Sequence, residues 1–233
     1  MLMRLLGVLL VAAVLLAPLA WGQPTLRIVA YDGTSLAGAL VRVSTLDGRV
    51  YEFTLNPAAP FTVKDVVKGV LRVEVVSWKG VPVNYEKTVT VYENSTLVVP
   101  SIGRLTVAVK GARGQALPGA LVTISRGGVT VEEGSAGSSG IYSTLLPAGT
   151  YEVAVAYGGR SARVEAVVEP SRESRVEAAL DVVAEVGGWA LSASELLGVS
   201  LLAVLAVFAV YVALYEYASW RKRRAARVVA PGG

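Results

Sequence analysis

The sequence contains neither cysteine nor histidine. Without cysteine no disulfide can form, so a secreted domain of this chain must be held together by its hydrophobic core alone. The same absences remove the commonest general base, the thiol nucleophile and the usual zinc ligands. A Ser–Lys dyad or a carboxylate pair remains chemically open, although no spacing suggests one. The sequence therefore favours a protein that is not an enzyme and that needs no metal or cofactor.

Amide side chains are scarce as well. The 233 residues include three asparagines and two glutamines. A low content of thermolabile residues is typical of proteins from hot habitats, so the composition predicts a thermophile. A melting temperature in the ordinary mesophilic range would contradict that prediction.

The excess of positive charge lies at the two ends of the chain. Residues 23–195 carry 16 Lys and Arg against 17 Asp and Glu, which leaves no net basic charge for nucleic acid. The excess consists of Arg4 and a C-terminal cluster that includes Arg221, Lys222, Arg223 and Arg224. Basic residues beside apolar segments set the orientation of membrane proteins. The charge pattern thus indicates membrane topology and excludes a nucleic-acid partner.

Residues 1–22 have the pattern of a secretory signal peptide. Arg4 supplies the positive start, Leu5 to Ala17 form an apolar stretch, and Ala20-Trp21-Gly22 fits a cleavage site. An uncleaved anchor is the alternative, but the apolar stretch is short for a full membrane span.

Residues 196–217 are predicted to form a transmembrane helix. Leu196 to Tyr215 carries no charge over 20 residues, which is enough to cross a hydrocarbon core of about 30 Å. Ser192 to Glu195 fits a helix-capping box. Residues 183–195 are interpreted as a stalk with a flexible break at 186–189, and residues 218–233 as a basic cytoplasmic tail.

Between these segments the chain repeats itself. LAGALVRVS at Leu36–Ser44 matches LPGALVTIS at Leu117–Ser125 in six of nine positions, at an offset of 81 residues. Self-similarity at a fixed offset indicates tandem units. We therefore expect one domain over residues 23–100 and a second over residues 104–182.

Both units alternate apolar with polar residues and contain many Gly and Pro turns. This pattern predicts a mostly β fold of two tandem seven-stranded β-sandwiches. Residues 138–157 are interpreted as the central hairpin of the second sandwich, with its turn at Pro147 to Gly149 and with Tyr151 and Val153 in the core.

The motifs of the second unit resemble the carboxypeptidase regulatory-like family, which has a transthyretin-like (prealbumin-like) fold. Gly114–Ile124 is similar to its G-x-P-L-P-G-A-x-V-x-V element, Ser138–Tyr142 to T-D-x-x-G-x-Y, and Leu146–Val155 to L-P-x-G-x-Y-x-L-x-V. The first unit is a degraded copy, with Ala37 in place of the proline. The resemblance implies a structural or binding module attached to something else.

Related Cna B-type sandwiches form a Lys–Asn isopeptide bond, and Lys110 lies about where such a lysine could be. The required Asn or Asp in the last strand and the buried Glu after the turn are missing. Lys110 is therefore expected to face solvent as an ordinary lysine.

The chain offers few candidate sites. Asn94 begins an N-x-S/T sequon and is a glycosylation candidate. Trp78, Tyr85 and Tyr92 are a candidate aromatic platform for carbohydrate, although packing at the end of the core also explains Trp78. Ala209 and Ala213 form a small-xxx-small pair that could seat another helix.

The sequence as a whole predicts a single-pass plasma-membrane protein with its N-terminal domains outside the cytoplasm. Its expected partners are the lipid bilayer and another membrane or cell-surface protein. A non-catalytic interaction module, either a surface protein or an accessory subunit, is the first hypothesis. A carbohydrate-binding surface receptor is the alternative.

Overall fold

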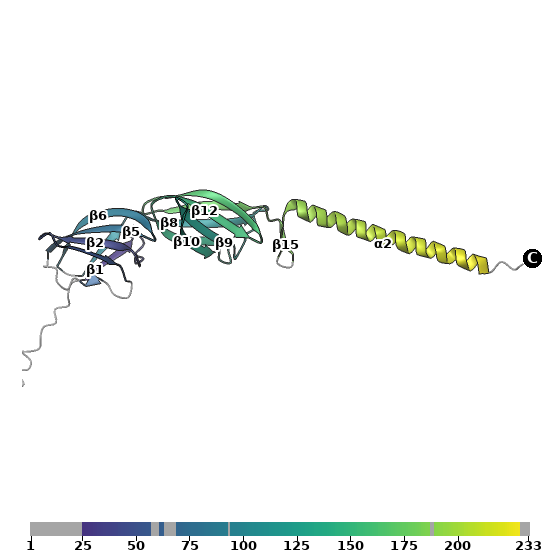
Figure 1. Ribbon diagram of the computed structural model, residues 1–233, viewed down its shortest axis with the longest axis horizontal. Coiled ribbons are helices and arrows are strands. Elements are labelled where there is room, and N and C mark those ends of the chain that lie inside the picture. Colours follow the sequence, from purple (N-terminus) through teal and green to yellow (C-terminus); the bar gives the residue numbers. More distant parts are fainter. Residues whose placement is uncertain (1–24, 57–60, 63–68, 93, 187–188, 229–233) are drawn as a thin grey trace, which may run out of the picture. The chain divides into compact units, whose positions relative to one another are not determined.

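A computed structural model describes residues 25–56, 61–62, 69–92, 94–186 and 189–228 (Figure 1). The predicted signal peptide therefore lies outside the described residues. The chain divides into two compact units, Met1–Ile102 and Gly103–Gly233. Nearly all regular structure in the first unit is β-strand, and the second unit adds a long C-terminal helix, as the sequence predicts.

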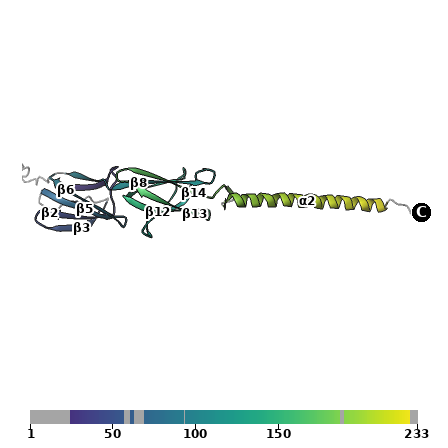
Figure 2. The ribbon, with the colours of Figure 1, turned by 90° about the horizontal axis from the view of Figure 1, so that it is seen from above.

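The first unit contains two sheets. One has the strand order β3-β2-β5-β6 and the other β4-β1-β7. In chain order the strands are β1 (Thr25–Ala30), β2 (Leu40–Thr45), β3 (Val50–Thr54), β4 (Phe61–Thr62), β5 (Gly69–Trp78), β6 (Val81–Val91) and β7 (Ser95–Val99). Figure 2 shows β2, β3 and β5 lying side by side. Alternate residues of these strands are buried, for example Val41 and Val43 in β2, because each sheet turns one face to the core.

The second unit repeats this arrangement with sheets β10-β9-β12-β13 and β11-β8-β14. Its strands are β8 (Ile102–Gly111), β9 (Leu121–Arg126), β10 (Val129–Ser135), β11 (Ile141–Pro147), β12 (Gly149–Tyr157), β13 (Arg160–Val168) and β14 (Glu173–Leu180). In both units the first strand pairs in parallel with the last, β1 with β7 and β8 with β14.

The same backbone hydrogen bonds occur within each unit, at positions that differ by 81 residues. Gly38 donates to the carbonyl of Leu55, as Gly119 does to that of Ala136, at 2.8 Å in each case. Leu55 in turn donates to Ala39, as Ala136 does to Ala120. The two units thus share strand order and local hydrogen bonding.

The interpretation of residues 138–157 as a hairpin is wrong. β11 and β12 belong to opposite sheets and do not pair with each other. The reason is local: residues Thr144–Pro147 are all buried, as expected for a chain that crosses the interior, and Ala148 alone separates the two strands. Gly149 then turns the chain with a φ of 147°, a conformation that side chains with a Cβ rarely adopt.

The predicted stalk contains regular structure that the sequence analysis missed. β15 (Ala184–Val186) pairs antiparallel with β16 (Trp189–Leu191), where a flexible break was expected. α2 (Ala193–Val228) follows directly. The predicted capping box is confirmed: the Ser192 amide donates to the Glu195 carboxylate at 2.9 Å, and the Glu195 amide to the Ser192 hydroxyl at 3.3 Å.

The start of α2 is also tied to the sandwich of the second unit. Arg160, at the beginning of β13, forms an ion pair with Glu195. Tyr157, at the end of β12, donates its hydroxyl to Glu185 in β15 at 2.7 Å. Gly158 lies so close to Ala190 that a Cβ there would come within 2.4 Å of the alanine Cβ. The β12–β13 turn therefore packs against the β15–β16 hairpin.

Candidate functional site

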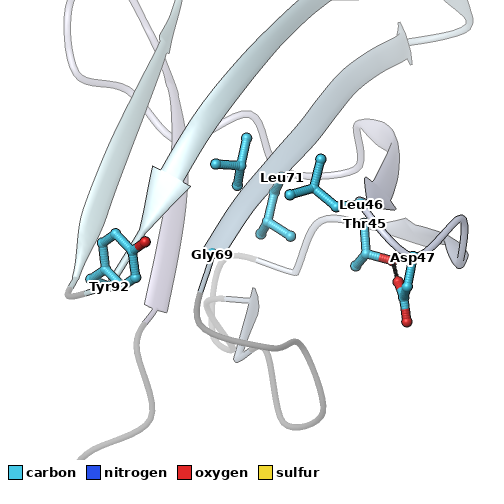
Figure 3. A pocket seen from close by; sticks show the side chains of 7 residues that line it. Thr45, Leu46, Asp47, Gly69, Leu71 and Tyr92 are labelled. Atoms are coloured by element: carbon cyan, nitrogen blue, oxygen red, sulfur yellow. Dashed lines mark hydrogen bonds between the residues drawn. The ribbon is translucent and has the colours of Figure 1, made fainter.

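A cavity of about 320 Å³ opens at one end of the first unit, where β2 ends and β5 begins. Figure 3 shows Tyr92 on one side of this cavity and Thr45 with Asp47 on the other, with Leu71 between them. Among the described residues, the cavity is lined by Thr45, Leu46, Asp47, Gly69, Val70, Leu71 and Tyr92. Hereafter it is called the Tyr92 cavity.

The polar side of the Tyr92 cavity is organised by the turn between β2 and β3. The Thr45 hydroxyl donates to the Asp47 carboxylate, which also forms an ion pair with Arg49 at 3.0 Å. The hydrogen bond from Thr45 and the charge of Arg49 hold the pKa of Asp47 below its usual range. Asp47 is therefore ionised at neutral pH and can accept further hydrogen bonds at the rim.

The other side of the Tyr92 cavity is apolar and open. Leu46 is 83% exposed and Tyr92 is 61% exposed, so both side chains present accessible apolar surface. Leu71 also lines the cavity but is buried at 1% exposure, so its side chain offers almost no accessible surface there. The cavity thus combines a carboxylate, a hydroxyl and an aromatic ring around an apolar base.

The three aromatic residues of the predicted carbohydrate platform are placed differently from one another. Trp78 is 6% exposed, its indole Nε1 donates to the Ala37 carbonyl at 2.9 Å, and Lys79 Nζ lies 4.8 Å from the centre of its ring. Tyr85 is half-buried opposite Val75 in the β5–β6 pair. Tyr92 alone of the three lines the cavity. Carbohydrate binding by these residues stays a prediction, and Tyr92 is the residue best placed for it.

The position of Trp78 has a measurable consequence. We expect Trp78→Phe to lower the free energy of unfolding by about 0.5–1.5 kcal/mol, because the Ala37 carbonyl loses its donor. Thermal unfolding followed by circular dichroism measures this change. The interpretation of Trp78 as a packing residue would be contradicted if the substitution left stability unchanged but abolished binding of a ligand.

Asn94 lies on the surface of the first unit. Its side-chain Oδ1 accepts hydrogen bonds from the Thr25 amide at 3.0 Å and the Thr25 hydroxyl at 2.9 Å. These bonds engage the oxygen, whereas a glycan would be attached to the nitrogen. Glycosylation of Asn94 stays a prediction.

Lys110 in β8 forms an ion pair with Glu177 in β14, with 2.6 Å between Nζ and Oε2. The two side chains are 37% and 56% exposed, so this is a solvated surface ion pair.

We expect the intact mass of the protein to show no loss of water or ammonia, because Lys110 and Glu177 remain an ion pair. High-resolution mass spectrometry under denaturing conditions gives this mass. A mass lower by one water, restored by Glu177→Ala, would instead demonstrate a covalent bond.

α2 presents its apolar side chains outward. The part from Ala193 to Arg221 has a mean hydropathy of 2.6, is long enough to cross a membrane, and has none of its apolar window buried. Ala209 and Ala213 lie within it, and Arg221 to Arg224 continue the helix at its far end. Trp189, 77% exposed, precedes it in β16. Such a helix is stable in lipid and would be costly to expose to water.

Metal binding has no visible site in the part of the chain that the structure describes. Among those residues no three His, Cys, Asp or Glu side chains come together in a way that could hold a metal ion. The acidic residues near β13 and β14, such as Glu165 and Glu169, line a polar pocket of about 340 Å³ that also contains Arg175.

The chain thus combines β-sandwich units with one helix that is long and apolar enough to span a membrane. Comparison with known proteins shows which family the second unit resembles. Residues 104–181 match the family model described as carboxypeptidase regulatory-like domain. The resemblance of the second unit to this family is thereby confirmed, and the interpretation of the first unit as another copy of the same family stays a prediction. No curated protein matches the chain.

Several solved structures are similar to the chain at low identity. The minor pilin GBS52 of Streptococcus agalactiae is 17% identical, with 70% of this chain and 98% of that chain covered and a TM-score of 0.33. The shaft pilin SpaA of Lactobacillus rhamnosus GG is 12% identical over 70% and 98%, with a TM-score of 0.36. The Bacillus anthracis TIE protein is 18% identical, with 67% of this chain covered and a TM-score of 0.32, and the chain spans 34% of its length.

Proposed function

We propose that the chain is a non-catalytic interaction module that α2 anchors in the plasma membrane, acting as a surface protein or as an accessory subunit of a membrane complex. The observation that carries this proposal is the helix Ala193–Arg221, whose apolar side chains are not covered by any other part of the chain that the structure describes. Lipid, or lipid together with another membrane helix, is the environment that satisfies them.

The basic residues Arg221 to Arg224 support an orientation with the C-terminal tail in the cytoplasm and both units outside. Trp189 at one end of the span, and Tyr217 and Trp220 at the other, support interfacial positions for both ends. The ties between the β12–β13 turn and the start of α2 would then hold the second unit next to the membrane surface.

A binding role is favoured over catalysis by the chemistry of the side chains. The sequence supplies no histidine or cysteine, and Asp47 in the Tyr92 cavity is already paired with Arg49. A paired, ionised carboxylate accepts hydrogen bonds well but is a poor proton donor at neutral pH.

The proposal is tested by isolating the full-length protein from its native membrane in a gentle detergent and identifying what accompanies it by mass spectrometry. The matched control has poly-leucine in place of Leu196–Tyr215. A stoichiometric partner that is lost in the control supports an accessory subunit assembled through the helix. A partner that is kept supports recognition by the sandwiches. The absence of any stoichiometric partner contradicts the subunit hypothesis.

A further inference from the structure

β13 is an edge strand of the second unit with one open side. It pairs with β12 along all nine residues, from Arg160 opposite Tyr157 to Val168 opposite Gly149, without any shift in register. Among the strands that the structure describes, none pairs with its other side. Every second backbone N–H and C=O group of β13 therefore points outward, where another strand can pair with it.

The corresponding edge of the first unit is protected against such pairing. β6 has the place in its sheet that β13 has in the second unit. It contains Pro82, its pairing with β5 shifts in register, and the φ of Asn84 is 48°. Lys87 lies opposite the buried Val73, so its charge is on the core-facing side of the strand. Prolines, irregular pairing and inward-facing charges all discourage the pairing of edge strands.

β13 lacks these features. It contains neither proline nor glycine, and its pairing with β12 is regular. Arg160, at its first position, is engaged by Glu195 in α2. The residues that follow on the core-facing side are all apolar, namely Ala162, Val164, Ala166 and Val168. Nothing in the strand itself therefore hinders the approach of a further strand.

The charges on the outer face of β13 are unbalanced within one chain. Glu165 lies directly opposite Glu152 in the β12–β13 pair, and like charges in that position repel each other. Arg163 forms its ion pair with Glu152, at 3.1 Å. Among the described residues Glu165 has no ion pair of its own. A cation opposite Glu165 on the open side of β13 would therefore be favourable.

We propose that β13 pairs antiparallel with β13 of a second copy of this chain, about a twofold axis at Val164. In this register Arg163 of each copy lies opposite Glu165 of the other, so two pairs of opposite charge form. Val164 is also the midpoint of the nine residues, so the two strands overlap along their full length. This pairing deepens the proposed interaction role, on which it rests, by naming a partner of the second unit.

Other antiparallel registers are less favourable. Side chains of the outer face meet one another only when the twofold axis passes through a residue. An axis at Arg163 would place two arginines opposite each other, and an axis at Glu165 would do the same with two glutamates. An axis further along the strand shortens the overlap. Charge and length therefore favour the same register.

The number of chains per particle tests the pairing. It is measured by light scattering on the full-length protein in detergent, with circular dichroism to verify folding. We expect two chains for the native protein, and one chain for Arg163→Glu and for Glu165→Arg, because each variant opposes like charges. The exchanged variant Arg163→Glu/Glu165→Arg should regain two chains. Arg113→Glu, in an exposed loop of the same unit, is the matched control and should keep two chains.

Disulfide formation tests the register, because the natural chain has no cysteine. Ser161→Cys and Val167→Cys are expressed separately and together, and then oxidised mildly. Positions 161 and 167 of opposite copies would have Cα atoms about 4.5–5.5 Å apart, within reach of a disulfide. Two copies of one variant would hold their cysteines about 20 Å apart. We expect a disulfide-linked dimer only when both variants are expressed together.

Several results would overturn the inference. These are one native chain per particle, two chains in both single charge variants, failure of the exchanged variant to regain two chains, or a disulfide in either cysteine variant alone. A dimer that survives charge reversal would be assembled elsewhere, for example through α2. Self-association is measured on the purified protein, so its absence is distinct from failure to isolate a different partner from the native membrane.

Discussion

Replacing Tyr151 by alanine is expected to lower the free energy of unfolding of the second unit by about 3–5 kcal/mol. The ring is buried at the end of the core, its hydroxyl bonds to the Pro147 carbonyl, and Arg126 packs on its face. Truncation removes the apolar contacts and leaves both the carbonyl and the guanidinium without their partner. A loss of this size is a large part of the stability of a small domain.

The change is measured by thermal and urea unfolding of the protein in nanodiscs, followed by circular dichroism. The first unit is followed separately by fluorescence in a chain that keeps Trp78 as its only tryptophan. We expect the Trp78 signal to change at the same urea concentration with or without Tyr151→Ala, since the two residues belong to different units. The conservative variant Tyr151→Phe isolates the hydroxyl and is expected to lose about 1–3 kcal/mol. A loss below about 1 kcal/mol for Tyr151→Ala would contradict the role assigned to the ring.

Arginine at both Leu205 and Phe208 is expected to abolish membrane integration. Both side chains lie near the middle of the span and point away from the protein, at 54% and 63% exposure. Each arginine at the centre of a membrane helix costs about 2.5–3.5 kcal/mol on insertion, and two together cost about 5–7 kcal/mol. The native helix gains its stability in lipid from the apolar residues that these arginines replace.

Alkaline carbonate extraction of membranes measures the effect. The native protein should stay with the membrane pellet, and the double variant should move to the soluble fraction. Ala218→Arg is the matched control, because it adds a charge beside Arg221 at the end of the span. Retention of the double variant in the pellet would mean that something other than α2 holds the protein to the membrane.

Much of the architecture could be predicted because it depends on local patterns. Alternating apolar residues predict strands, the repeated G-A-L-V segments reveal two related units, and 20 uncharged residues reveal the helix. The capping box at Ser192 and Glu195 and the burial of Tyr151 were predicted on the same basis, and the hydrogen bonds and exposed fractions confirm both. Each of these features is determined by residues close together in the sequence.

The features that were missed depend on residues that meet only in the fold. Periodicity near Tyr151 indicates a strand on each side of Pro147, but not that the two strands belong to opposite sheets. The pairing of β15 with β16 was missed for two reasons. The strands have three residues each, which is too short for a clear pattern, and the contacts that support them come from Tyr157 and Gly158, which lie elsewhere in the sequence.

The Tyr92 cavity was missed because the residues that line it come from the end of β2, from the start of β5 and from Tyr92, which are far apart in the sequence and meet only in the fold.

The central claim is that a membrane helix holds both units outside the cytoplasm, and cysteine labelling tests it most directly. Because the natural chain has no cysteine, single cysteines introduced at Ser161, which is exposed in β13, or after Gly233 are the sole targets of a thiol reagent that cannot cross membranes. In intact cells we predict labelling at position 161, and labelling after Gly233 only once the membrane is permeabilised. The reverse pattern, or labelling of both positions in intact cells, would contradict the account.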